Sequence, residues 1–205
     1  MNKRKETKVM KLELNKIKTS IEQHHKIYRF PVKAELWEDI FDQSLNGWDS
    51  SWTGGGHSTG ADVISENGDN TRYQNKGGKI NFNTNTIKWN GHRTTSHKTI
   101  EEKVDFISKP HYDKYVMLGR VKRDWDNDIK RYYLINFDSK LIQYDKLNWV
   151  EKLGVRGKNK GKVVGWVGSN VNLPYTAEIN ISQSHQLWTT CDLDYLGKIE
   201  EILID

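Results

Sequence analysis

The chain has 205 residues, 35% of them hydrophobic, which is enough for one globular domain with a buried core. Eight Trp, nine Tyr and five Phe exclude a disordered chain, because disordered segments are poor in aromatic residues. The single cysteine, Cys191, excludes an internal disulfide framework and a cysteine-built zinc site. We find no run of about 18 apolar residues and no apolar signal segment after the basic start, so we expect a cytoplasmic protein without a membrane span.

The net charge of +5 is distributed unevenly along the chain. Residues 1–33 carry ten Lys or Arg against three acids, and residues 72–103 carry seven against two. Between them, residues 34–71 hold eight acids and no Lys or Arg. This pattern suits a protein that binds a polyanion and also holds a cation, although a merely uneven surface would produce it too.

Two helices are predicted at the start of the chain. Residues 2–28 have an apolar stripe at spacings of four and three, formed by Met10, Leu14, Ile17, Ile21 and Tyr28. This helix fits a dimerisation arm, a DNA-contacting arm or a helix docked along the domain. After Pro31 a second helix is expected over 34–45, followed by a Gly/Ser/Thr-rich loop over 48–60.

Strands dominate the rest of the prediction. A hairpin is expected around Asn67-Gly68, with strands at 61–65 and 72–76. Further strands are predicted at 79–82, 112–121, 131–137, 162–167 and 175–181, a helix at 99–108, and a strand or short helix at 195–204. No repeat or linker divides residues 1–205, so we expect a single α+β domain, with helices packed on a mixed sheet.

The predicted hairpin holds the residues best suited to chemistry. Asp62 lies on its first strand, and Gln74 and Lys76 share one face of the second, with Asn75 on the other face. If the strands pair antiparallel, Asp62 lies beside that face. An acid, an amide oxygen and a lysine can together hold a hard divalent cation and orient an attacking water.

A further acid is expected from the second helix. Glu38 borders the apolar stripe of this helix, whereas Glu35 and Asp42 point away from it. We therefore expect Glu38 to complete the metal site, with Glu35 as the other candidate.

Glu38, Asp62 and the triplet Gln74-Asn75-Lys76 resemble the PD-(D/E)XK nucleases, and the small size resembles a type II restriction endonuclease. The resemblance covers about residues 35–80 and departs at Ala61, where the family has proline, and at Gln74, where it has an acid. It implies a central mixed sheet flanked by helices, and Mg²⁺ held by Asp62, Glu38 and Gln74, with Lys76 positioning the water. It also implies a homodimer that cuts double-stranded DNA at a specific sequence, with a cognate DNA methyltransferase in the same system.

Three polar segments are candidates for DNA binding, because their side chains suit base edges and phosphates. We expect contacts from His57, Ser58, His92, Arg93, Thr94, Thr95, Lys98, Gln183, Ser184 and Gln186. Arg93 is expected to reach a guanine, and Lys158 and Lys160 to contact phosphates.

Two other functions compete with a PD-(D/E)XK-like nuclease. The seven histidines could form a zinc site, but neither His24-His25 nor His92 and His97 have the spacing of a known metal motif. The many aromatic residues could instead form a non-catalytic binding module that stacks on nucleic acid or carbohydrate. Against this, Trp37, Trp149 and Trp188 lie in apolar stretches that predict core positions.

Overall fold

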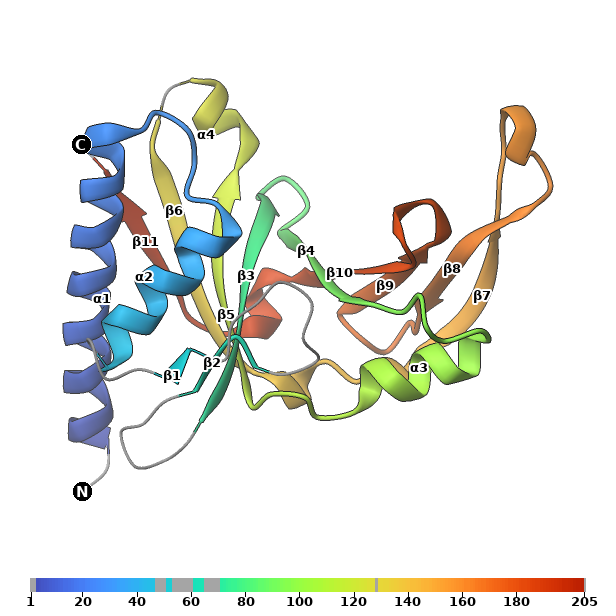
Figure 1. Cartoon of the computed structure of the whole chain (residues 1–205), viewed down its shortest axis with the longest axis horizontal. Helices are drawn as coiled ribbons and strands as arrows, with labels where there is room; N and C mark the ends of the chain where they lie inside the picture. The colour runs from blue at the N-terminus through green and yellow to red at the C-terminus, as the bar shows by residue number, and fades with distance from the viewer. Residues whose placement is uncertain (1–2, 47–50, 53–60, 65–70, 128, 205) are drawn as a thin grey trace.

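Two helices lie against one side of a large twisted sheet, which extends away from them into a protruding hairpin (Figure 1). The computed structural model describes residues 3–46, 51–52, 61–64, 71–127 and 129–204. Its helices are α1 (Lys3–Ile27), α2 (Ala34–Asn46), α3 (Ile100–Ser108) and the short α4 (Lys122–Asp126). None of these helices is long and apolar enough to span a membrane.

The described strands form one mixed sheet. They are β1 (Ser51–Trp52), β2 (Val63–Ile64), β3 (Arg72–Asn81), β4 (Thr86–Arg93), β5 (Lys114–Val121), β6 (Arg131–Asp138), β7 (Asn148–Leu153), β8 (Val163–Ser169), β9 (Tyr175–Asn180), β10 (Gln186–Asp192) and β11 (Ile199–Leu203). Their order is β11-β6-β5-β3-β4-β10-β9-β8-β7. Outside this order, β2 pairs with β3, and β1 pairs with β2. Only the β3–β5 pair is parallel among these described strands, with β4 and α3 in the connection between them. The prediction of a single domain with helices on a mixed sheet is confirmed.

The two N-terminal helices pack on the sheet through the predicted apolar stripe. Ile17 and Ile21 are 1% and 0% exposed, and they join Trp37 and Phe41 of α2 in one core cluster with β5. Burying each such isoleucine contributes about 1.5–3 kcal/mol relative to an exposed position. This part of the α1 stripe is therefore used inside the domain, whereas Tyr28, predicted on the same stripe, follows the end of the helix and is 46% exposed.

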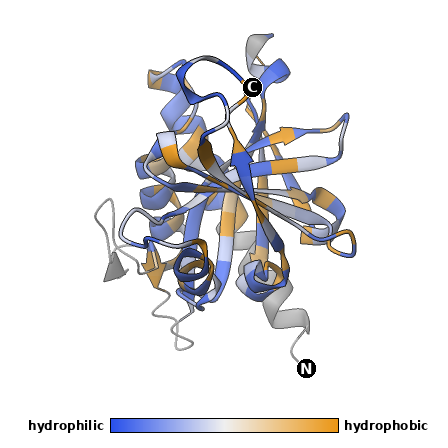
Figure 2. Ribbon diagram, turned by 90° about the vertical axis from the view of Figure 1, so that its right-hand side faces the viewer, coloured by the Kyte–Doolittle hydropathy of each residue, from blue (hydrophilic) through white to orange (hydrophobic). Residues whose placement is uncertain are grey.

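Strand β5 explains why the sheet has a core on both faces. Val116 and Leu118 belong to the cluster beneath α1 and α2, while Tyr115 and Met117 belong to the cluster on the opposite face. Alternate side chains of a strand point to opposite faces, so a strand covered on both sides is apolar throughout. Figure 2 shows the resulting apolar segments interleaved with polar ones along the strands.

The structure differs from the sequence prediction at several strands. Strand β3 is continuous from Arg72 to Asn81, although Gly77-Gly78 predicted a break. A side chain at Gly78 would place its Cβ 2.4 Å from Ile87 Cδ1, so this glycine permits close packing rather than a turn. Strands β4 (Thr86–Arg93), β7 (Asn148–Leu153) and β10 (Gln186–Asp192) were not predicted. The C-terminal segment, predicted as strand or helix, contains strand β11.

Candidate active site

Asp62 lies just before β2 and is held against the start of β3. Strands β2 and β3 pair antiparallel as predicted, with Val63 opposite Tyr73, and the Asp62 amide donates to the Tyr73 carbonyl at 2.9 Å. The Asp62 Oδ2 atom accepts hydrogen bonds from the Asn75 backbone N–H at 2.7 Å and from the Gln74 side-chain amide. The predicted turn at Asn67-Gly68 lies outside the described residues.

Lys76 completes this arrangement on the same strand. Its Nζ atom lies 3.5 Å from Asp62 Oδ2, and the two side chains are only 20% and 18% exposed. Asn75 is buried on the other face of the strand. The expected grouping of Asp62 with Gln74 and Lys76 is therefore present in the structure.

Glu38 reaches the same region from α2, the helix predicted to supply an acid. It is half-buried, and burial together with the charge of Asp62 raises its pKa to about 7, partly offset by the charge of Lys76. Glu35 is exposed on the same helix and adds only a smaller repulsion. The structure thus favours Glu38 over Glu35. Asp42, which was expected in solvent, is 9% exposed instead.

Asp62 is partly buried, close to the acid Glu38 and the cation Lys76. Burial raises the pKa of Asp62, and the Lys76 charge and the Asn75 N–H counteract that rise. Gln74 Oε1 is buried and has no hydrogen-bond partner among the described residues. Two carboxylates and an unpaired amide oxygen form a donor set that suits a hard cation. The described residues contain no group of three or more His, Cys, Asp or Glu that could hold a metal.

His92 lies near this cluster, which the sequence did not indicate. Strands β3 and β4 pair with each other only between Gly78–Asn81 and Thr86–Trp89. The first part of β3 pairs with β2 and β5 instead, and the end of β4 pairs with β10. His92 lies on the diverging part of β4 and stacks on Tyr112 with ring centroids 5.7 Å apart.

The His92 ring is held uncharged. Burial, together with the charges of His111 and Lys76, lowers its pKa to about 4. His92 was predicted as a DNA contact; the structure places its ring among those of Phe106, His111 and Tyr112.

Two of the predicted DNA-binding segments lie side by side. The Thr94 N–H and hydroxyl both donate to the His185 carbonyl, at 3.1 and 3.0 Å, and the Thr95 hydroxyl donates to the Ser184 carbonyl at 2.8 Å. Arg93 Nε donates to Gln186 Oε1 at 3.4 Å. We call this contact between residues 93–95 and 184–186 the polar seam.

The seam contains both buried supports and exposed candidates. Thr94 is 0% exposed and Gln186 is 8% exposed, with its amide bonded to the Gly91 carbonyl, so these two side chains support the seam from inside. Arg93, Thr95 and Ser184 are exposed.

The remaining DNA-contact candidates lie around the seam. Lys98 is exposed just before α3, and exposed Gln183 accepts a hydrogen bond from Trp188 Nε1 at 2.7 Å. His57 and Ser58 lie outside the described residues.

No protein-family model matches the chain, and no curated protein is significantly similar to it.

Proposed function

We propose that this protein is a Mg²⁺-dependent endonuclease that hydrolyses phosphodiester bonds in double-stranded DNA, as a type II restriction endonuclease does. The observation that carries the proposal is the convergence of Asp62, Gln74 and Lys76 at the edge of β3, with Glu38 contributed by α2. These are the residues on which the resemblance to the PD-(D/E)XK nucleases depends.

Glu38, Asp62 and Gln74 are the residues that would hold Mg²⁺. The unpaired oxygen of Gln74 and the two mutually repelling carboxylates fit a cation, because a positive charge would satisfy the first and stabilise the ionised form of the others. When bound, Mg²⁺ supplies a Lewis acid for the phosphate and its attacking water.

Lys76 acts on the water and on the charges around it. Its ammonium group lies beside Asp62, where it can donate to an attacking water or to a phosphate oxygen. The same positive charge lowers the pKa of both Asp62 and Glu38, which keeps more of each carboxylate ionised at neutral pH.

The polar seam is the proposed base-reading surface. Arg93 is exposed and follows Gly91-His92, and its guanidinium fork fits the O6 and N7 atoms of guanine. The internal hydrogen bonds of Thr94 and Gln186 support the loop that presents Arg93.

A homodimer is the simplest assembly for cutting both strands of a palindromic site, because each copy then attacks one strand. Since Ile17 and Ile21 are buried within the domain, a dimer contact by α1 uses its outer face rather than this stripe. A cognate DNA methyltransferase is the partner that such an enzyme requires in its own cell.

Incubating plasmid DNA with the protein and Mg²⁺ tests the proposal. Discrete fragments that disappear with EDTA support a sequence-specific nuclease, and a smear indicates a nonspecific one. Binding without cutting would instead favour the aromatic-rich binding module. Of the three tryptophans expected in the core, Trp37 is 1% exposed, whereas Trp149 and Trp188 are only partly buried. Trp89, 1% exposed, is a further core tryptophan, so part of the aromatic content serves the core.

A further inference from the structure

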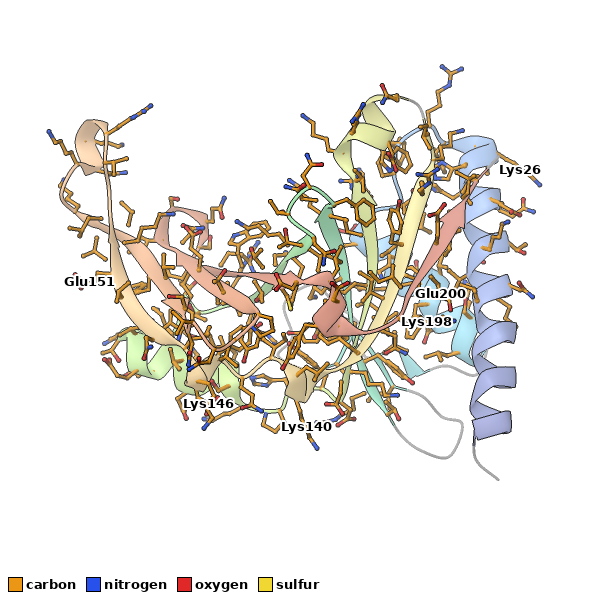
Figure 3. The ribbon with its side chains drawn as sticks, turned by 180° about the vertical axis from the view of Figure 1, so that it is seen from behind. Lys26, Lys140, Lys146, Glu151, Lys198 and Glu200 are labelled. Carbon is orange, nitrogen blue, oxygen red and sulfur yellow. The ribbon has the colours of Figure 1, made fainter. Side chains whose placement is uncertain are left out.

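The hairpin of β7 and β8 projects from the end of the sheet farthest from α1, as Figures 1 and 3 show. We call residues 148–169 the β7–β8 arm and residues 154–162 its tip. The tip contains four cations and no acid: Arg156, Lys158, Lys160 and Lys162. All four are exposed, and none forms an ion pair with any residue described in the structure.

The tip is a closed structure rather than a loose loop. The Gly154 N–H donates to the Lys162 carbonyl at 2.9 Å, and the Gly161 N–H donates to the Gly154 carbonyl at 2.8 Å. Gly157 and Gly161 have φ values of 58° and 74°, a conformation that side-chain-bearing residues rarely adopt. These bonds order the backbone that carries the four cations, which reduces the backbone entropy lost when the tip binds a partner.

Protection of the sheet edge does not account for this charge. Lysines on an edge strand can prevent pairing with another chain, and β7 is the last strand of the sheet. However, the four cations lie beyond Leu153 and before Val163, where the two strands end, so they do not cover the edge of β7. An unpaired cluster at the end of a projecting hairpin instead indicates an anionic partner.

We propose that the tip of the β7–β8 arm binds the phosphate backbone of duplex DNA, with the two-stranded arm placed along or within the major groove. The proposal rests on the proposed DNA-cutting function and assigns a binding surface separate from the polar seam. A two-stranded ribbon fits the width of the major groove, and lysine and arginine supply the counterion-releasing contacts to phosphate.

An anionic membrane is the competing partner, because Val155 is 81% exposed beside the cations. The arm contains no aromatic residue between Val150 and Val163, although aromatic side chains are typical anchors at membrane interfaces. The strongly exposed apolar side chains of the arm, Val150, Leu153 and Val155, are aliphatic and suit contact with thymine methyl groups, while its two tryptophans, Trp149 and Trp166, pack partly buried against the core. DNA is therefore the favoured partner.

The experiment compares two doubly substituted proteins with equal net charge. One is Lys158→Gln with Lys160→Gln in the tip. The control is Lys140→Gln with Lys198→Gln, two exposed lysines that lie outside the arm (Figure 3). Fluorescence anisotropy measures binding to a labelled duplex in EDTA, between about 50 and 200 mM KCl, so that no cleavage interferes.

The expected result is a change in salt dependence that is specific to the tip. Losing two phosphate contacts lowers the slope of log K against log salt by about 1.8, and weakens binding at 0.1 M salt about 60-fold if the curves converge near 1 M. Lys158→Arg with Lys160→Arg keeps the charge and should keep the wild-type slope. The Lys140 and Lys198 control should change the slope by much less.

Two outcomes overturn the proposal, and they can be told apart. If wild type binds the duplex and the tip and control variants change its slope equally, the arm makes no specific contact, while the proposed nuclease function stands. If wild type binds phosphatidylserine vesicles but no duplex, the arm serves a membrane and the proposed function fails with it. Plasmid cleavage by wild type in Mg²⁺ checks that function independently of the arm.

Discussion

Replacing Lys76 with alanine tests the chemistry of the site most directly. The ammonium group lies 3.5 Å from Asp62 Oδ2, and both side chains are about four-fifths buried. Coulomb's law at this distance gives about 1–5 kcal/mol for effective dielectric constants between about 80 and 20. Losing this attraction disfavours the ionised forms of Asp62 and Glu38, and it also removes the group proposed to orient the attacking water.

The two effects predict two separate measurements. A catalytic group of this kind contributes about 10²–10⁴-fold, so the single-turnover cleavage rate at saturating Mg²⁺ should fall by that factor, or about 2.7–5.4 kcal/mol in barrier height. The pH at which Mg²⁺ binding is half-maximal should rise, because both carboxylates lose a neighbouring cation that lowers their pKa.

A matched control lies on the same strand. Lys79 is exposed on β3, three residues beyond Lys76, and Lys79→Ala removes the same charge and side chain. Duplex binding in EDTA should survive in both variants. Cleavage by Lys76→Ala at the rate of Lys79→Ala would show that Lys76 has no catalytic role and would refute this reasoning.

Four further predictions follow from the same geometry. Asp62→Asn should abolish plasmid cleavage, as EDTA should in wild type; cutting that continues in EDTA would eliminate a metal mechanism. Gln74→Glu should retain activity and tighten Mg²⁺ binding in a calorimetric titration, whereas unchanged affinity would remove Gln74 from the ligand set. Glu38 has a pKa of about 7, above its ordinary value of 4.5, so in EDTA wild type should lose stability as pH rises through this interval. Glu38→Gln should avoid that loss, and a difference in Tm that does not change between pH 5 and 8 would contradict the raised pKa. Arg93→Ala should cost about 1–3 kcal/mol of discrimination between cognate and non-cognate duplexes, whereas equal weakening of both would make Arg93 a backbone contact.

Local patterns were sufficient for the elements that position the chemistry. The apolar stripe of α1 requires only that residues three and four apart share a helix face, and Ile17 and Ile21 are buried as that rule predicts. Alternation along a strand likewise placed Gln74 and Lys76 on one face and Asn75 on the other. These predictions succeed because they depend on neighbours within a few residues.

Tertiary structure decided everything that depends on partners far along the chain. Thr94 follows a polar sequence typical of an exposed loop, but hydrogen bonds to His185, 91 residues later, bury it completely. Strand β10 is likewise defined by pairing with β4 and β9, not by its own composition.

The electrostatic state of the site was decided in the same way. The sequence by itself determined that Glu38, Asp62 and Lys76 are present, at spacings that a helix and a hairpin can bring together. The pKa of Glu38 near 7 and that of His92 near 4 arise from burial and from charges on other elements. Desolvation and Coulomb energy depend on distances through space, and only the packing of α2, β3 and β4 sets those distances.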